Sequence, residues 1–127
     1  VIGLTLHYDS WTVKVVDVEA AFLDGDMEKT MCIEWPADVV EMGFVTEEKK
    51  EEHCIEQLKS MCGNSDAALI YFKLFKTHVV KVMGVKQSLV DPCVFHKESE
   101  DEVVLVAVTH VDDTALAGTP AWIKWFK

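Results

Sequence analysis

The most constraining feature of this 127-residue chain is the segment VVLVAVTHVDDTALAG, which runs from Val103 to Gly118. Two adjacent carboxylates, Asp112 and Asp113, lie between two short apolar runs, and the second run ends at a glycine. Short valine-rich runs bounded by turn-forming residues are typical of buried strands. The segment therefore predicts a β-hairpin with its acidic pair at or near the tip.

Two interpretations of the acidic pair are open at this point. Adjacent carboxylates repel each other, and one of them takes up a proton unless a cation neutralises the pair. Magnesium and manganese are the usual cations for such sites, because they prefer hard oxygen ligands. The other interpretation is a solvated turn that happens to contain two aspartates, and the hairpin alone does not decide between the two.

A third carboxylate, Asp17, falls within Thr12–Val18, a segment whose β-branched residues predict a strand. A carboxylate in an apolar strand costs free energy unless it is paired or binds a metal, although an edge-strand Asp can simply face water. If this strand lies beside the hairpin, three carboxylates converge. Such a cluster can hold two divalent cations about 3.5–4 Å apart, which suits phosphoryl or nucleotidyl transfer.

The rest of the chain alternates between short strands and helices, which indicates one α+β domain with an antiparallel sheet and helices on one face. The longest predicted helix carries an apolar stripe that we assign to core packing and ends at Gly84. The stripe consists of Ala68, Phe72, Phe75, Val79 and Val82. The other predicted elements are strands at 31–35, 54–58 and 93–96 and helices at 46–56, at 67–83 and from Pro120 onward.

Composition limits the classes of function. Half of the residues are hydrophobic, which argues against disorder, and the net charge of -10 gives no global basic surface for nucleic acid. The four cysteines have no zinc-finger spacing, so we expect reduced, buried thiols in an intracellular protein rather than a zinc site. No signal peptide or membrane span is predicted, and the initial valine suggests an internal piece of a longer protein.

Four blocks of the sequence occur in a fixed order, namely VVDVEAAFLDGDMEKTMCIEWP, CIEQLKSMCG, SLVDPCVF and HVDD…LAG. These blocks resemble the reverse transcriptases of copia-type retrotransposons. The first block resembles the first palm motif of that family, and the last resembles the YVDD hairpin of the polymerase. Their order and spacing agree with the family over nearly the whole chain.

The resemblance implies a partial reverse transcriptase domain over residues 1–127, with a palm of ferredoxin-like core and part of the fingers. It implies that Asp17, Asp112 and Asp113 are catalytic and bind two Mg²⁺ or Mn²⁺ ions, with the carbonyl of Val18 as a further ligand. Phe22 matches the aromatic residue that selects deoxynucleotides by excluding a 2′-hydroxyl, although ordinary core packing would also explain an aromatic residue there.

The partners implied by the resemblance are an RNA or DNA template-primer and a deoxynucleoside triphosphate. The remaining polymerase, RNase H and integrase regions are expected outside this chain, and the family's location is a cytoplasmic virus-like particle, with no membrane association. Ser65 and Asp66 occupy positions that should approach the nucleotide, where the family has Gln and basic residues. His110 and Cys62 replace tyrosines of the family pattern.

These departures leave three hypotheses. The chain belongs to an RNA-directed DNA polymerase, or it is a degenerate or domesticated relic that binds a partner without catalysis. The third hypothesis is an unrelated acidic α+β binding domain in which the Asp-Asp turn is incidental. We expect the isolated chain to be inactive even if the first hypothesis holds.

Overall fold

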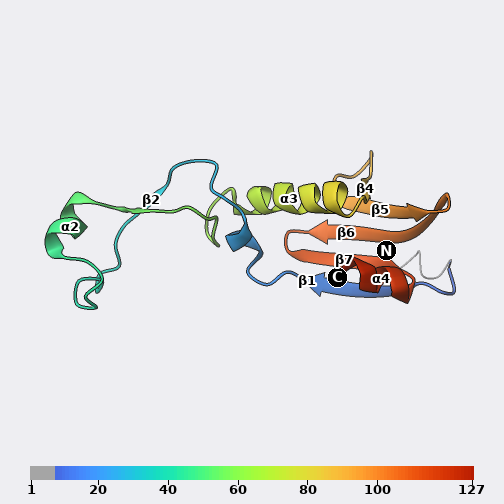
Figure 1. Cartoon of the computed structure of the whole chain (residues 1–127), viewed down its shortest axis with the longest axis horizontal. Helices are drawn as coiled ribbons and strands as arrows, with labels where there is room; N and C mark the ends of the chain where they lie inside the picture. Colours follow the sequence, from blue (N-terminus) through green and yellow to red (C-terminus); the bar gives the residue numbers. More distant parts are fainter. Residues whose placement is uncertain (1–7) are drawn as a thin grey trace. The chain divides into compact units, whose positions relative to one another are not determined.

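The computed structural model describes residues 8–127, which separate into two compact units (Figure 1). The first unit joins the segment that ends at Ala21 to Tyr71–Lys127, and the second comprises Phe22–Ile70. Within residues 8–127, no helix is long and apolar enough to cross a membrane.

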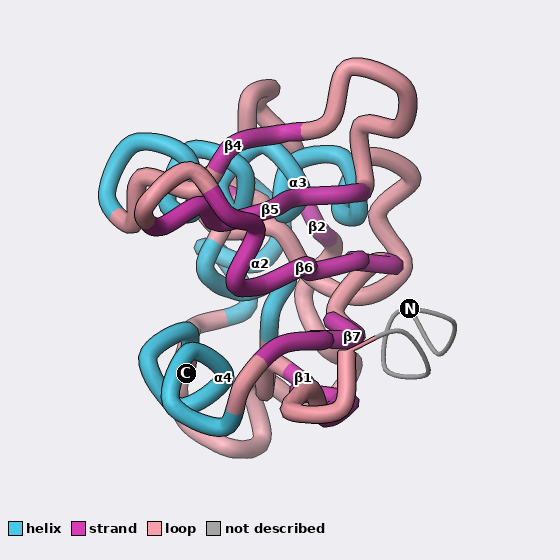
Figure 2. The backbone as a smooth tube through the Cα atoms, turned by 90° about the vertical axis from the view of Figure 1, so that its right-hand side faces the viewer, coloured by secondary structure: helices cyan, strands magenta, loops and turns pink. Residues whose placement is uncertain are grey.

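The first unit is built on a five-stranded antiparallel sheet with the strand order β1-β7-β6-β5-β4, which Figure 2 shows with β4 at the top and β1 at the bottom. The sheet and its helices confirm the predicted α+β class with an antiparallel sheet. The strands are β1 (Thr12–Asp17), β4 (Lys86–Gln87), β5 (Val94–Ser99), β6 (Glu102–His110) and β7 (Asp113–Gly118).

The predicted hairpin is confirmed as β6 and β7, which pair from Leu105↔Gly118 to His110↔Asp113. Alternate residues of β6, namely Leu105, Ala107 and Thr109, are buried, as the two-residue period of a strand requires. This alternation assigns one face of the hairpin to the core, while Val104, Val106 and Val108 on its other face are half-buried.

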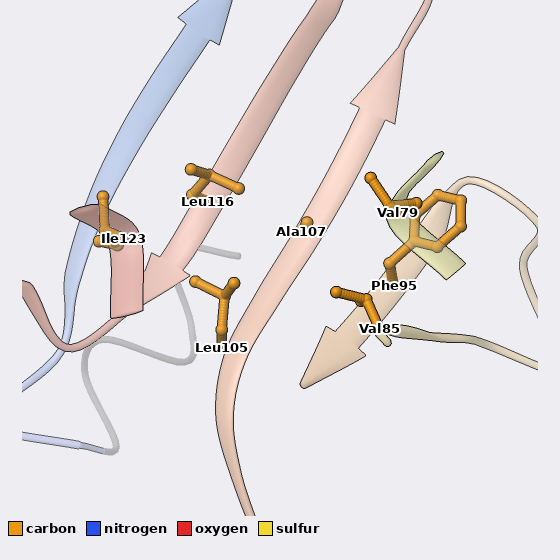
Figure 3. Close-up of a cluster of buried hydrophobic side chains, with 7 residues drawn as sticks. All are labelled: Val79, Val85, Phe95, Leu105, Ala107, Leu116 and Ile123. Carbon is orange, nitrogen blue, oxygen red and sulfur yellow. The ribbon is translucent and has the colours of Figure 1, made fainter. Parts of the chain in front are cut away.

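The core lies on the face of the sheet that the helices cover (Figure 3). Phe95, Ala107 and Leu116 occupy opposed positions on β5, β6 and β7, so their side chains share that face. Val79, from the segment that follows α3, and Ile123 of α4 (Pro120–Phe126) complete the same buried cluster. The expectation that helices pack on one face is thus confirmed.

The predicted helix at 67–83 forms as α3 (Ala67–Thr77), which continues into a π-helical turn, η2 (His78–Val82). The predicted stripe is correct for Phe72, Phe75 and Val79 but wrong at both ends, because Ala68 is exposed and Val82 is 73% exposed. A π turn widens the helix by one residue per turn and shifts the phase of every later position. That shift turns Val82 outward while Val79 stays in the core.

The first turns of α3 bury a different set of residues from the one predicted. Ala67, Ile70 and Tyr71 are buried there, and Ala67 and Tyr71 each lie one position before a residue of the expected stripe. Alanine adds little to a hydrophobic pattern, so the choice between Ala67 and Ala68 had almost no weight in the sequence. The existence of the helix is correct, and its buried face differs from the predicted one at the first turn as well as at the π turn.

The second unit contains a small two-stranded sheet and one short helix. The strands β2 (Cys32–Ile33) and β3 (Ile55–Glu56) are shorter than predicted, and α2 (Glu47–Glu52) is capped by Thr46, whose hydroxyl accepts the Lys49 N–H at 3.4 Å. The second unit also includes most of η1 (Ala21–Asp24), a single 3₁₀ turn, and the first turn of α3, which crosses into the first unit after Ile70. These elements are too short to bury much apolar surface.

The expectation that the cysteines are buried is wrong. Cys32, Cys54 and Cys62 are exposed, and Cys93 is half-buried. The strands β2 and β3 form a two-stranded ribbon, and the side chains on the uncovered surface of such a ribbon face solvent.

Candidate functional site

Asp17 and Asp113 lie directly opposite each other at the ends of β1 and β7. This pairing confirms that the Asp17 strand lies beside the hairpin. Both side chains are exposed, and opposed residues in an antiparallel pair have Cβ atoms about 4.5–5.5 Å apart. Two carboxylates therefore occupy neighbouring positions on one face of the sheet.

Asp112 belongs to the two-residue loop, Val111 and Asp112, that joins β6 to β7. Val111 has a φ of 57°, whereas Asp112 is not among the residues with positive φ. Positive φ at the first loop residue alone is the pattern of a type II′ turn, in which that position normally holds glycine. A β-branched residue there is strained, and such strain tends to occur at functional loops.

His110 faces Asp113 from the other side, because it is the β6 partner of that residue. Asp17, Asp113 and His110 thus form a row across three adjacent strands, and all three are exposed. His110 is therefore the β6 neighbour of the acidic pair.

A buried pair of hydroxyls lies on the opposite face of the same strand ends. The Thr114 hydroxyl donates to the Thr109 hydroxyl at 3.2 Å, and the Thr109 hydroxyl donates to the Asp113 carbonyl at 3.4 Å. Thr109 and Thr114 are 2% and 1% exposed. These bonds fix the backbone of Asp113 from the core side.

The donor set suits a hard divalent cation, because the opposed carboxylates supply oxygen ligands and gain from neutralisation. Within residues 8–127, however, no group of three or more His, Cys, Asp or Glu side chains is arranged to hold a metal ion. The sheet register therefore brings Asp17 and Asp113 together, while the convergence of Asp112 on the same point stays a prediction. The carbonyl oxygen of Val18 accepts the Ala21 N–H at 3.3 Å. A carbonyl oxygen has two lone pairs, so this hydrogen bond is compatible with the predicted role of Val18 as a metal ligand, which stays a prediction.

Three other predicted site residues lie in the second unit. Phe22 is half-buried in η1, and Ser65 is exposed. Asp66 directly precedes α3, its carbonyl accepts the Ile70 N–H at 2.9 Å, and its Oδ1 atom is buried without a hydrogen-bond partner. The roles of these residues toward a nucleotide remain predictions.

Asn64, in the same segment, has a structural role that its sequence position does not reveal. Its Oδ1 accepts the Gln57 side-chain N–H at 3.3 Å, and its amide nitrogen contacts the sulfur atoms of Met27 and Met31, both at 3.6 Å. Gln57 is itself 8% exposed and also donates to the Lys59 carbonyl at 2.7 Å. Asn64 thereby ties the loop before α3 to the segments around β2 and β3.

Two features of the site have no clear signal in the sequence. The strain at Val111 is unexpected, because valine is a poor residue for a left-handed position. The bond between Thr109 and Thr114 depends on the hairpin register, which becomes visible only once the loop is known to have two residues.

Comparison with known proteins identifies the family to which this chain belongs. The chain is a member of the reverse transcriptase (RNA-dependent DNA polymerase) family, whose model matches residues 2–127. It is similar to the retrovirus-related Pol polyprotein from transposon TNT 1-94 of Nicotiana tabacum, with 29% identity over 106 residues. These findings confirm the resemblance to copia-type reverse transcriptases.

That alignment covers 84% of this chain but only 8% of the tobacco polyprotein. No solved structure matches the chain. Membership of the family is therefore shown by sequence, whereas the activity of the whole polyprotein is a matter for proposal.

Proposed function

We propose that this chain carries the catalytic carboxylates of an RNA-directed DNA polymerase from a copia-type retroelement. The observation that supports this most directly is the opposition of Asp17 and Asp113 beside the loop that carries Asp112. Three acidic positions at one end of one sheet, in a member of the reverse transcriptase family, match the carboxylates that this chemistry requires. We further propose that the five-stranded unit is the polymerase palm.

The proposed reaction is nucleotidyl transfer. A primer 3′-hydroxyl attacks the α-phosphorus of a deoxynucleoside triphosphate, a phosphodiester bond forms, and pyrophosphate leaves. Asp17, Asp112 and Asp113 would hold two Mg²⁺ or Mn²⁺ ions, which when bound stabilise the charge on the attacking and leaving oxygens. The buried bonds of Thr109 would keep the Asp113 backbone in place during each cycle.

The family resemblance is the basis of the proposed nucleotide contacts. We propose from it that Phe22 would exclude a 2′-hydroxyl and that Ser65 and Asp66 would contact the incoming nucleotide. The template-primer would be held largely by other regions of the polyprotein, since this chain has a net charge of -10.

The second candidate is a relic that keeps the fold but does not polymerise. Asp66 favours it, because a carboxylate at a triphosphate-binding position repels the substrate. The metal sites are the point at which the two candidates differ, since a relic has no need to keep them.

Metal binding can be measured on this chain directly. We expect Mn²⁺ titration, followed by calorimetry and by electron paramagnetic resonance, to show binding that is at least about tenfold weaker in the Asp17→Asn, Asp112→Asn double variant. The matched control is Asp101→Asn, which removes one acidic charge at the far end of β6. Equal Mn²⁺ affinity in the wild type and the double variant would contradict the proposed site.

Activity should be tested in a protein that includes the adjoining polyprotein regions. We expect primer extension on an RNA template to require Mg²⁺ and to be abolished by Asp113→Asn. We also expect Phe22→Ala to raise the incorporation of ribonucleotides relative to deoxynucleotides. A protein that binds Mn²⁺ through these carboxylates but never extends a primer would favour the relic.

A further inference from the structure

Two exposed thiols meet in the second unit, away from the acidic site. Cys32 belongs to β2, and Cys54 immediately precedes β3. Their thiols are hydrogen-bonded to each other, and both side chains are exposed to solvent. Neither residue has a role in the proposed polymerase reaction.

The strand register accounts for this contact. Cys32 is opposed to Glu56 and Ile33 to Ile55, so continuing the pairing by one step places Cys54 opposite Glu34. Cys32 and Cys54 are therefore diagonal neighbours on the same face of the ribbon, and their thiols meet across it.

The environment of the pair affects its reactivity. The hydrogen bond that the Cys32 thiol donates to Cys54, with smaller effects from desolvation and from the charges of Cys54 and Glu56, raises the pKa of the Cys32 thiol. A raised pKa lowers the fraction of thiolate near neutral pH, and the thiolate is the reactive form. Oxidation of the pair is therefore expected to become faster as the pH rises.

We propose that Cys32 and Cys54 are a redox modification site that closes into a reversible disulfide on reaction with a small-molecule disulfide. The other thiols are less suitable. Cys62 lies beyond β3 in the loop before α3, and Cys93 belongs to the other unit. The inference does not rest on polymerase activity, because it concerns contacts within β2 and β3 alone.

The exchange proceeds in two balanced steps. One cysteine thiolate attacks a sulfur of the small-molecule disulfide, so that a mixed disulfide forms and one small thiolate leaves. The second cysteine thiolate then attacks the protein sulfur of that mixed disulfide and releases the second small thiolate. The two released thiolates take up the two protons that the cysteines lose, and the two electrons from the cysteines reduce the small-molecule disulfide.

The link would constrain a defined segment. The disulfide closes the chain between Cys32 and Cys54, which includes α2 and Trp35, whose indole N–H donates to the His53 carbonyl at 2.7 Å. The strands β2 and β3 have only two residues each, so few backbone bonds hold this segment in the reduced state. We expect oxidation to protect residues 34–53 from proteolysis.

The test uses the full chain in mixtures of reduced and oxidised glutathione, followed by acid quenching, alkylation and peptide mass spectrometry. We expect the Cys32–Cys54 link to exceed any other internal link by about tenfold, since the folded chain holds these thiols at a high effective concentration. Dithiothreitol should reverse it, and concentrated urea should abolish the preference.

Matched variants separate the proposal from general thiol reactivity. Cys62→Ser should retain both the link and the protection of residues 34–53, whereas Cys32→Ser and Cys54→Ser should lose both. Circular dichroism of each variant checks that the chain has folded, and Cys32→Ala and Cys54→Ala serve as replacements for a serine variant that has not. The proposal is overturned if folded protein accumulates glutathione on Cys32 and Cys54 without linking them, or if Cys54 pairs mainly with Cys62.

Discussion

Asp17, the last residue of β1, and Asp113, the first residue of β7, are cross-strand partners on an exposed face of the sheet. Like charges in this relation destabilise a sheet unless a cation lies between them. Because β7 also pairs with β6, the hairpin fixes the position of Asp113 and the edge strand carries Asp17 to it. The acidic pair is thus a direct product of the strand order.

The first prediction concerns the repulsion in this pair. At neutral pH and in the presence of EDTA, Asp113→Asn should raise the free energy of unfolding by about 0.2–1 kcal/mol, because it removes one of two negative charges that face each other across the strands. With millimolar Mg²⁺ the wild type should gain stability and the variant should not, since only the wild type keeps both carboxylates. Urea unfolding in the two buffers measures both effects.

Asp101→Asn is the control for this prediction, because it makes the same change of charge in the turn between β5 and β6. It should have little influence on the response to Mg²⁺. An Asp113→Asn variant that is no more stable than Asp101→Asn in EDTA would show that the two carboxylates do not repel each other significantly.

The second prediction concerns the strained loop. Val111→Asn should stabilise the chain by about 1 kcal/mol, because asparagine tolerates positive φ far better than a β-branched residue does. The same change at Val15, which is 63% exposed on extended β1, should instead destabilise the sheet, because asparagine is a poor strand residue. Chemical denaturation of both variants gives the comparison, and equal signs for the two changes would contradict strain at Val111.

The hairpin and its acidic tip could be predicted because the signal is local. Valine-rich runs, a short polar break and a closing glycine together leave few other structures for Val103–Gly118. The position of Asp17 needed one assumption, namely that its strand pairs with the hairpin, and the structure confirms it. The phase of α3 was predicted less well, because the π turn at His78–Val82 depends on packing that a fixed period does not represent.

The finer features of the site depend on relations between distant residues. The contact of Cys32 with Cys54 follows from the pairing of two very short strands, and the role of Asn64 follows from the burial of Gln57. Neither pairing has a periodic pattern in the sequence. The sequence therefore located the carboxylates but not the bonds that position the loops around them.

The third prediction concerns the two buried hydroxyls. Thr109→Val should cost about 1–3 kcal/mol, because it leaves the buried Thr114 hydroxyl without its acceptor and the Asp113 carbonyl without that donor. Thr114→Val should cost less, since Thr109 keeps its bond to Asp113. The double variant should be more stable than Thr109→Val alone, because no hydroxyl is then orphaned. Urea unfolding of this mutant cycle measures the coupling, and strictly additive costs would contradict a bonded pair.

The last prediction concerns acid stability at the far end of β5. The pKa of Glu98 is lowered, mainly by its hydrogen bond from Lys86 and further by the Lys86 charge and by His96, whose Nε2 lies 3.1 Å from Oε1. A carboxyl whose pKa is lower in the folded state stabilises the fold above its unfolded pKa, and this contribution is lost as the pH falls through the folded value.

The wild type should therefore lose stability on acidification below the ordinary glutamate pKa of 4.5 more steeply than a Lys86→Met variant. Lys81→Met, at an exposed lysine of η2, is the control and should keep the wild-type slope. Because both partners are partly exposed, the difference should shrink in high salt. Thermal unfolding as a function of pH measures the slopes, and identical slopes for the wild type and Lys86→Met at low salt would show that this ion pair does not affect stability.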